Sequence, residues 1–289
     1  MRHAAARIRA LAASALALAL AFSGCDTASP EPSADARADA EAAALSIAQA
    51  VATESGGLLE DASDALRLAG APASLNPPGR AGCTGTRTYD AEDGRWTSTF
   101  SCERGNPDGR VYAAFGRTTT HQFLGADGQP QPEPRGATRL NYTISDATGV
   151  RRVPGFSHTL LELGADFAVT DFEQRLATIN GTYVRAATDT VAAPGVTRTL
   201  AARVAMQLQD VRAPRSLEPS WERAVSGTIT GHYRATMTMT TRAGQTRTQE
   251  IDRPFTITFG DEGGARVALI ALGRHRFAAD LRSGVLVGR

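Results

Sequence analysis

The chain has 289 residues, of which 42% are hydrophobic and 21% charged, an ordinary composition for a globular protein that forms its own core. Its 31 basic residues are all arginine, and they balance 30 acidic residues without forming a cluster along the sequence. Binding to nucleic acid requires a concentrated basic surface, so we expect no nucleic acid among the partners of this chain.

The first 24 residues have the pattern of a secretory signal peptide. Arg2, Arg7 and Arg9 precede an apolar run at positions 10–22, in which only Ser14 is polar. A charged start followed by a short apolar run is typical of such signals. The run is shorter than the roughly 20 apolar residues that a spanning helix needs, so it predicts export and not a membrane span.

The end of this region predicts a lipid anchor. Phe22-Ser23-Gly24-Cys25 resembles the lipobox of bacterial lipoproteins, although leucine is usual where Phe22 stands. The resemblance implies cleavage before Cys25 and attachment of acyl chains to it, which makes the membrane an expected partner. The alternative is an ordinary signal peptide followed by an unrelated cysteine. We expect anchoring in the bacterial cell envelope. The outer membrane is slightly favoured, and Asp26 leaves the inner membrane open.

Residues 25–38 contain the lipidated cysteine and a predicted disordered tether. After Cys25 this stretch holds no bulky apolar side chain, so it cannot bury enough surface to fold. As a flexible coil it would span on the order of 20 Å.

Residues 39–79 form a predicted helical segment. Its apolar residues recur at spacings of mostly three or four, which indicates an amphipathic helix, and they are Ile47, Val51, Leu58, Ala62, Leu66 and Ala69. Gly56-Gly57 interrupts the pattern, so two shorter helices are an alternative. Asn76-Pro77-Pro78-Gly79 closes the segment.

Residues 80–289 predict an antiparallel β domain. Turn sequences such as Asn106-Pro107-Asp108-Gly109 and Asn180-Gly181 separate runs that alternate apolar and polar residues. We expect a mainly β fold with one large antiparallel meander of about 10 to 12 strands, and no βαβ rhythm. The meander would form a curved sheet, a sandwich or a partial barrel. The N-terminal helical segment would pack on it, so that residues 39–289 fold as one unit.

The clearest strand is 225–239, where apolar and polar residues alternate throughout. Gly227 and Gly231 leave two gaps on its apolar face, and glycine inside a strand often marks close approach by another element. We expect the helical segment to lie across the strand at these gaps. A bound apolar molecule and packing from a second sheet are the alternatives.

Cys83 and Cys102 predict a disulfide inside a hairpin. Counting outward from the turn Ala91-Glu92-Asp93-Gly94 places Cys83 directly opposite Cys102, and Tyr89 opposite Trp96. Directly opposed residues lie within disulfide range, and an exported chain meets oxidising conditions. Free or metal-binding thiols are the alternative.

The sequence carries no clear catalytic motif. No histidine pair has metal-ligand spacing, so we expect no metal and no cofactor. Ser157 lies in Gly-Phe-Ser-His-Thr, which departs from the nucleophile-elbow pattern at its last position, so we predict a plain strand and assign no catalytic residue. His232 and Arg234 share the polar face of strand 225–239, where a solvated face is favoured over a binding surface.

Three functions are considered for the mature domain, and the first is favoured over the second and the second over the third. The first is a non-catalytic envelope lipoprotein that is structural or binds a protein partner. The second is a carrier of lipid or another apolar ligand, because a curved antiparallel sheet with a helix resembles the lipoprotein-carrier folds of the periplasm. The third is an enzyme whose site is assembled from scattered residues. A hydrophobic cavity would favour the second function, and converging acids or histidines the third.

Overall fold

The computed structural model describes residues 34–53, 56–70, 82–171, 174–214, 226–260 and 267–287. The predicted signal peptide, Cys25 and the first part of the predicted tether lie outside the described residues. The first helix begins at Ala34, several residues before the expected start of the helical segment at position 39.

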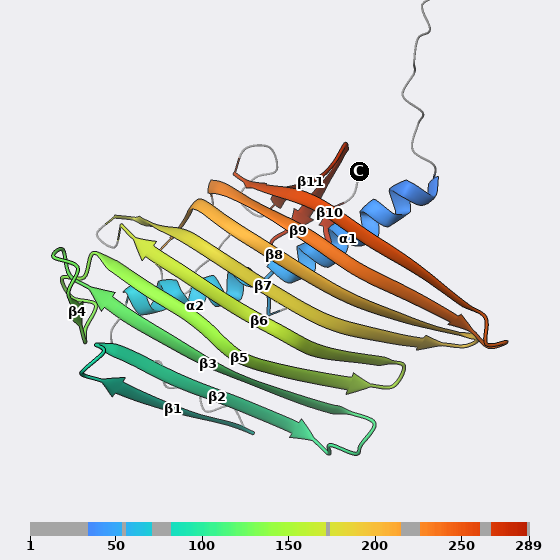
Figure 1. Ribbon diagram of the computed structural model, residues 1–289, viewed down its shortest axis with the longest axis horizontal. Helices are drawn as coiled ribbons and strands as arrows, with labels where there is room; N and C mark the ends of the chain where they lie inside the picture. Colours follow the sequence, from blue (N-terminus) through green and yellow to red (C-terminus); the bar gives the residue numbers. More distant parts are fainter. Residues whose placement is uncertain are drawn as a thin grey trace, which may run out of the picture.

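A single open antiparallel sheet carries two helices on one face, which confirms the expected mainly β fold (Figure 1). Neighbouring strands follow the chain order from one edge, β1, to the other, β13, and only the short β4 lies off this path. The described residues form 13 strands, one above the expected range of 10 to 12. Two of them, β4 and β13, have only two residues each, and strands this short give no alternation in the sequence. We call the face that carries the helices the inner face, and the opposite one the outer face.

The elements have the following bounds. The helices are α1 (Ala34–Val51) and α2 (Leu58–Gly70). The strands are β1 (Cys83–Asp90), β2 (Arg95–Gly105), β3 (Tyr112–Leu124), β4 (Pro130–Gln131), β5 (Arg139–Val153), β6 (Phe156–Thr170), β7 (Leu176–Ala193), β8 (Val196–Pro214), β9 (Ser226–Thr241), β10 (Thr246–Phe259), β11 (Val267–Leu272), β12 (His275–Asp280) and β13 (Leu286–Val287).

Two helices form, which was the alternative left open by Gly56-Gly57. A Cβ atom at Gly57 would lie 2.6 Å from the backbone oxygens of Ala50 and Ala52, so the chain can return this closely only at a glycine. The predicted stripe is buried, with Ile47, Leu58 and Leu66 fully covered. Covering one such side chain contributes about 1.5–3 kcal/mol, and the two short helices depend on this packing. α1 packs against β11–β13, and α2 against β5–β7.

The outcome at the two glycines of β9 differs from the expectation. The Phe255 ring, from the neighbouring strand β10, packs over Gly231 and fills the gap there. Gly227 has a φ of 112° and lies against the backbone of Asp210, so it is required by the backbone conformation. The atoms nearest to a Cβ at either glycine belong to β8 and β10, and none of them belongs to a helix. The neighbouring strand, and not a helix, therefore occupies the gap.

The hairpin of β1 and β2 has the predicted register. Cys83 pairs with Cys102, and Tyr89 pairs with Trp96. Gly94 takes a φ of 62° in the turn, a conformation that glycine adopts without a steric penalty. The sulfur atoms of the two cysteines are 2.03 Å apart, as in a disulfide bond.

Candidate functional site

The candidate site residues identified from the sequence do not come together in one place in the described structure. Cys25 lies outside the described residues, and the Cys83–Cys102 pair joins the two strands at one edge of the sheet. Among the described residues, no three His, Cys, Asp or Glu side chains are grouped closely enough to hold a metal ion. Ser157 and His158 are consecutive residues of β6, so their side chains point to opposite faces of the sheet. Ser157 therefore cannot use His158 as its base.

The hairpin ends of β5–β10 extend beyond the helices on the inner face, although α1 reaches β10 where Gln249 donates a hydrogen bond to Asp39 (Figure 1). Two rows of side chains cross the strands there, and we call them together the open strip. The row nearer the helices is Arg151, His158, Asp189, Leu200, Met237 and Gln249, and the row nearer the turns is Val153, Phe156, Val191, Arg198, Met239 and Arg247. The rows alternate with the threonine-rich positions of the outer face, because strand side chains point to the two faces in turn.

Apolar side chains of the open strip remain partly exposed although they lie on the face that forms the core. Val191 is 44% exposed and Met239 is 39% exposed, and Leu200 and Met237 are half-buried. Leu200 packs against the main hydrophobic core, so the strip continues the core surface without a gap. Contiguous apolar surface that stays exposed can mark a binding site, which makes the strip a candidate.

The open strip contains a histidine–aspartate pair. The His158 Nδ1 atom lies 2.7 Å from Asp189 Oδ1, and both side chains are partly exposed. The register brings them together across β6 and β7. A carboxylate in this position orients the imidazole ring.

Arginine side chains give the open strip a positive balance. Arg151, Arg198 and Arg247 are exposed there, and none of them forms an ion pair with another described residue. Asp189 is the acidic residue of the two rows, and its carboxylate already contacts His158. The carboxylate of Asp39 on α1 adds a second negative group beside the strip, at Gln249. Arg198 and Asp189 both act electrostatically on Tyr233, whose pKa is raised, mainly by burial. The strip therefore combines an apolar surface with fixed cations that could bind an anionic group.

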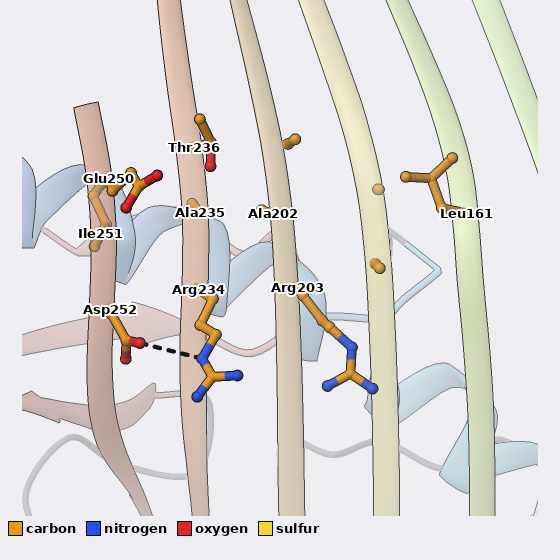
Figure 2. Close-up of a pocket in the computed structure, with 12 residues that line it drawn as sticks. Leu161, Ala202, Arg203, Arg234, Ala235, Thr236, Glu250, Ile251 and Asp252 are labelled. Atoms are coloured by element: carbon orange, nitrogen blue, oxygen red, sulfur yellow. Dashed lines mark hydrogen bonds and ion pairs between the residues drawn. The ribbon is translucent and has the colours of Figure 1, made fainter. Parts of the chain in front are cut away.

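Figure 2 shows a shallow hollow on the outer face, above the small side chains of β7 and β8. Arg203, Arg234 and Asp252 of its lining form ion pairs. Arg234 Nε lies 3.2 Å from Asp252 Oδ2, and His232 Nε2 lies 2.9 Å from Asp252 Oδ1. Arg203 forms a similar pair with Glu162 at 3.0 Å. His232 and Arg234 thus form part of a solvated, internally paired surface, and the open strip is the better candidate site.

A buried polar cluster attaches α2 to the sheet. Arg117 of β3 donates hydrogen bonds to Asp61, at 2.5 Å, and to Asp64. One arginine thus serves two carboxylates, and Asp61 is only 3% exposed. Burial raises the pKa of Asp61 to about 7, despite the opposing effect of Arg117. The cluster fixes the position of α2, but it offers no exposed group for catalysis.

Comparisons with protein-family models, curated proteins and solved structures found no match to this chain. None of the described helices combines the length and the apolarity needed to cross a membrane. The candidate site therefore depends on the geometry of this chain alone.

Part of the open strip could have been found in the sequence. The hairpin counting that paired Cys83 with Cys102 also places Arg151 opposite His158, around the turn at Pro154-Gly155. The contact of His158 with Asp189 could not have been found by counting from the connection between β6 and β7. A bulge at Leu160/Glu162 shifts the register of β6 and β7 between their connection and this pair.

Proposed function

We propose that this chain is a non-catalytic, membrane-anchored binding protein of the bacterial cell envelope. The ligand that best fits the open strip is an amphiphile, with an apolar chain and an anionic head group. The partly exposed apolar surface, which continues the core at the hairpin ends, is the observation that carries this proposal.

Each part of the strip has a role in this binding. Leu200, Met237 and Met239 would cover the apolar chain, and unbranched methionine side chains adapt readily to ligands of irregular shape. Arg198 and Arg247 lie in the row nearer the turns, so the head group would lie at the hairpin ends. An arginine fork matches the geometry of a carboxylate or phosphate.

The anchor predicted from the sequence supports this role. Lipid on Cys25 and the tether after it would hold the domain close to a supply of amphiphiles. The His158–Asp189 pair lies in the row nearer the helices, beside Leu200, so we assign it no contact with the head group.

Photocrosslinking in living bacteria tests the proposal on the full chain. The substitutions Met237→benzoylphenylalanine and Thr238→benzoylphenylalanine place the same reactive group on the inner and outer faces of β9. After irradiation, mass spectrometry of the purified protein should find a lipid-sized adduct at position 237 and none at position 238.

Charge reversal adds a second comparison. Arg198→Glu should reduce the adduct at position 237 at least about tenfold, since a head-group contact is lost and a repulsion is gained. Arg212→Glu, on the same strand but on the outer face, should leave it unchanged. Equal adducts at positions 237 and 238, or an adduct that is only a protein, would show that the strip does not bind an amphiphile.

A further inference from the structure

Arg87 of β1 is held in a fixed position on the inner face. Its guanidinium carbon lies 4.1 Å from the centre of the Trp96 ring, which is a cation–π contact. Its Nη2 atom lies 3.3 Å from His121 Nε2. The Trp96 ring is held in turn by a hydrogen bond from its Nε1 to the backbone oxygen of Pro132, at 2.9 Å. The guanidinium is therefore oriented from two sides before any ligand arrives.

The charge of Arg87 has no matching carboxylate among the described residues. Its nearest neighbours on this face of β1–β3 are Tyr89, Ser98 and Thr119, and all three are uncharged. Arg117 is the next arginine on this face, and Asp61 and Asp64 already neutralise it. An arginine that is half-buried without a counter-ion is unfavourable, because desolvation costs energy that no ion pair restores.

Two further observations agree with an uncompensated charge. The Arg87 Nε atom is buried and has no hydrogen-bond partner, although it is a donor. Burial and the positive charge of Arg87 together lower the pKa of His121 to about 3, so His121 is neutral and its Nε2 can accept from Arg87. A neutral imidazole orients the guanidinium but leaves its charge in place.

We propose that Arg87 forms an anion-binding site, in which the guanidinium holds a carboxylate or phosphate group and Trp96 and Tyr89 form an aromatic wall beside it. Tyr89 packs on Trp96 with ring centres 4.9 Å apart. The site lies on β1–β3, separate from the open strip, and it does not depend on amphiphile binding there. The anion could be free in solution or part of a lipid head group.

Trp96 fluorescence provides a direct assay on the full chain. Trp221→Phe removes the other tryptophan, so that the signal reports the ring in contact with Arg87. Sodium phosphate and sodium acetate are titrated at an ionic strength kept constant with sodium chloride. A parallel titration uses phosphatidylcholine vesicles with and without phosphatidylglycerol.

A saturable change in Trp96 emission with phosphate or acetate is the expected result for a free anion. A change only with the phosphatidylglycerol vesicles assigns the site to a lipid head group. In either case Arg87→Met should abolish the change. Arg87→Lys, which keeps the charge but loses the planar fork, should weaken binding about tenfold. Arg95→Met is the matched control, since Arg95 precedes Trp96 but lies on the outer face, and it should bind like the parent.

The proposal is overturned if none of the anions changes the emission beyond the sodium chloride control. It is also overturned if the Arg87→Met variant responds like the parent. Circular dichroism checks that the variants fold, and if Arg87→Met does not fold, Arg87→Lys decides. Unchanged affinity in the lysine variant would then refute the site, because the fork geometry would be irrelevant.

Discussion

Replacing Asp61 by asparagine should stabilise the protein at alkaline pH. Asp61 is 3% exposed, and burial is the main reason why its pKa rises from 3.8 to about 7. Asp64 and Glu60 on the same helix raise it further, whereas Arg117 of β3 and Arg185 of β7 lower it. At about 1.4 kcal/mol per pH unit, ionising the carboxylate in the folded state costs up to about 4 kcal/mol.

The sign of the pH dependence follows from the direction of this shift. Between pH 3.8 and about 7 the folded state binds a proton at Asp61 that the unfolded state has released. The contribution of Asp61 to the free energy of unfolding therefore decreases as the pH rises through this window, and it is constant above it. Asparagine has the same shape and stays neutral, so Asp61→Asn should lose this part of the dependence.

Urea unfolding followed by circular dichroism, at pH values from 4 to 9, measures the effect. We expect the variant to match the wild type near pH 4 and to exceed it at pH 8, by at most about 4 kcal/mol because a charged contact with Arg117 is also lost. Glu133→Gln, at an exposed carboxylate, should reproduce the wild-type profile. If the Asp61→Asn and wild-type profiles are parallel over the whole range, Asp61 is not the buried titrating group inferred here.

Three further predictions concern the fold and the anchor. The double variant Cys83→Ser/Cys102→Ser should lower the free energy of unfolding by about 3 kcal/mol in urea titrations, whereas an unchanged midpoint would mean that the bond contributes nothing. Gly231→Ala should lower the free energy of unfolding by about 1–3 kcal/mol, since a methyl group there overlaps the neighbouring strand. The control is Gly116→Ala, whose methyl group meets only ordinary contacts, and equal losses in the two variants would contradict this packing. Cys25→Ser should leave the precursor uncleaved and unlabelled by radioactive palmitate, and normal labelling of this variant would rule out the lipid anchor.

Local sequence patterns were sufficient to predict the parts of the fold that depend on residues close together in the sequence. A tight turn fixes the register of the two strands that it joins, so the pairing of Cys83 with Cys102 could be counted from the turn. Alternation along β9 correctly assigned its two faces, because successive side chains of a strand point in opposite directions. Gly56-Gly57 likewise indicated that the helical segment could divide into two helices, and two helices form.

The tertiary structure decided which distant residues meet. Phe255 fills the gap at Gly231, although both a helix and a neighbouring strand could supply an apolar side chain to such a gap. The contact of His158 with Asp189 depends on a bulge that cannot be predicted from the local sequence pattern. One inserted residue turns every following side chain of the strand to the other face.

The same reason applies to the charged groups. The sequence does not specify which acidic residues pair with Arg117. The packing of α2 on the sheet places Asp61 and Asp64 beside it. Arg87 reaches Trp96 on the neighbouring strand and His121 on the strand after that. The sequence by itself determined the strands and their faces, because these follow from interactions between near neighbours. The open strip and the uncompensated Arg87 required the completed sheet, since only its packing determines which side chains remain uncovered and which charges remain unpaired.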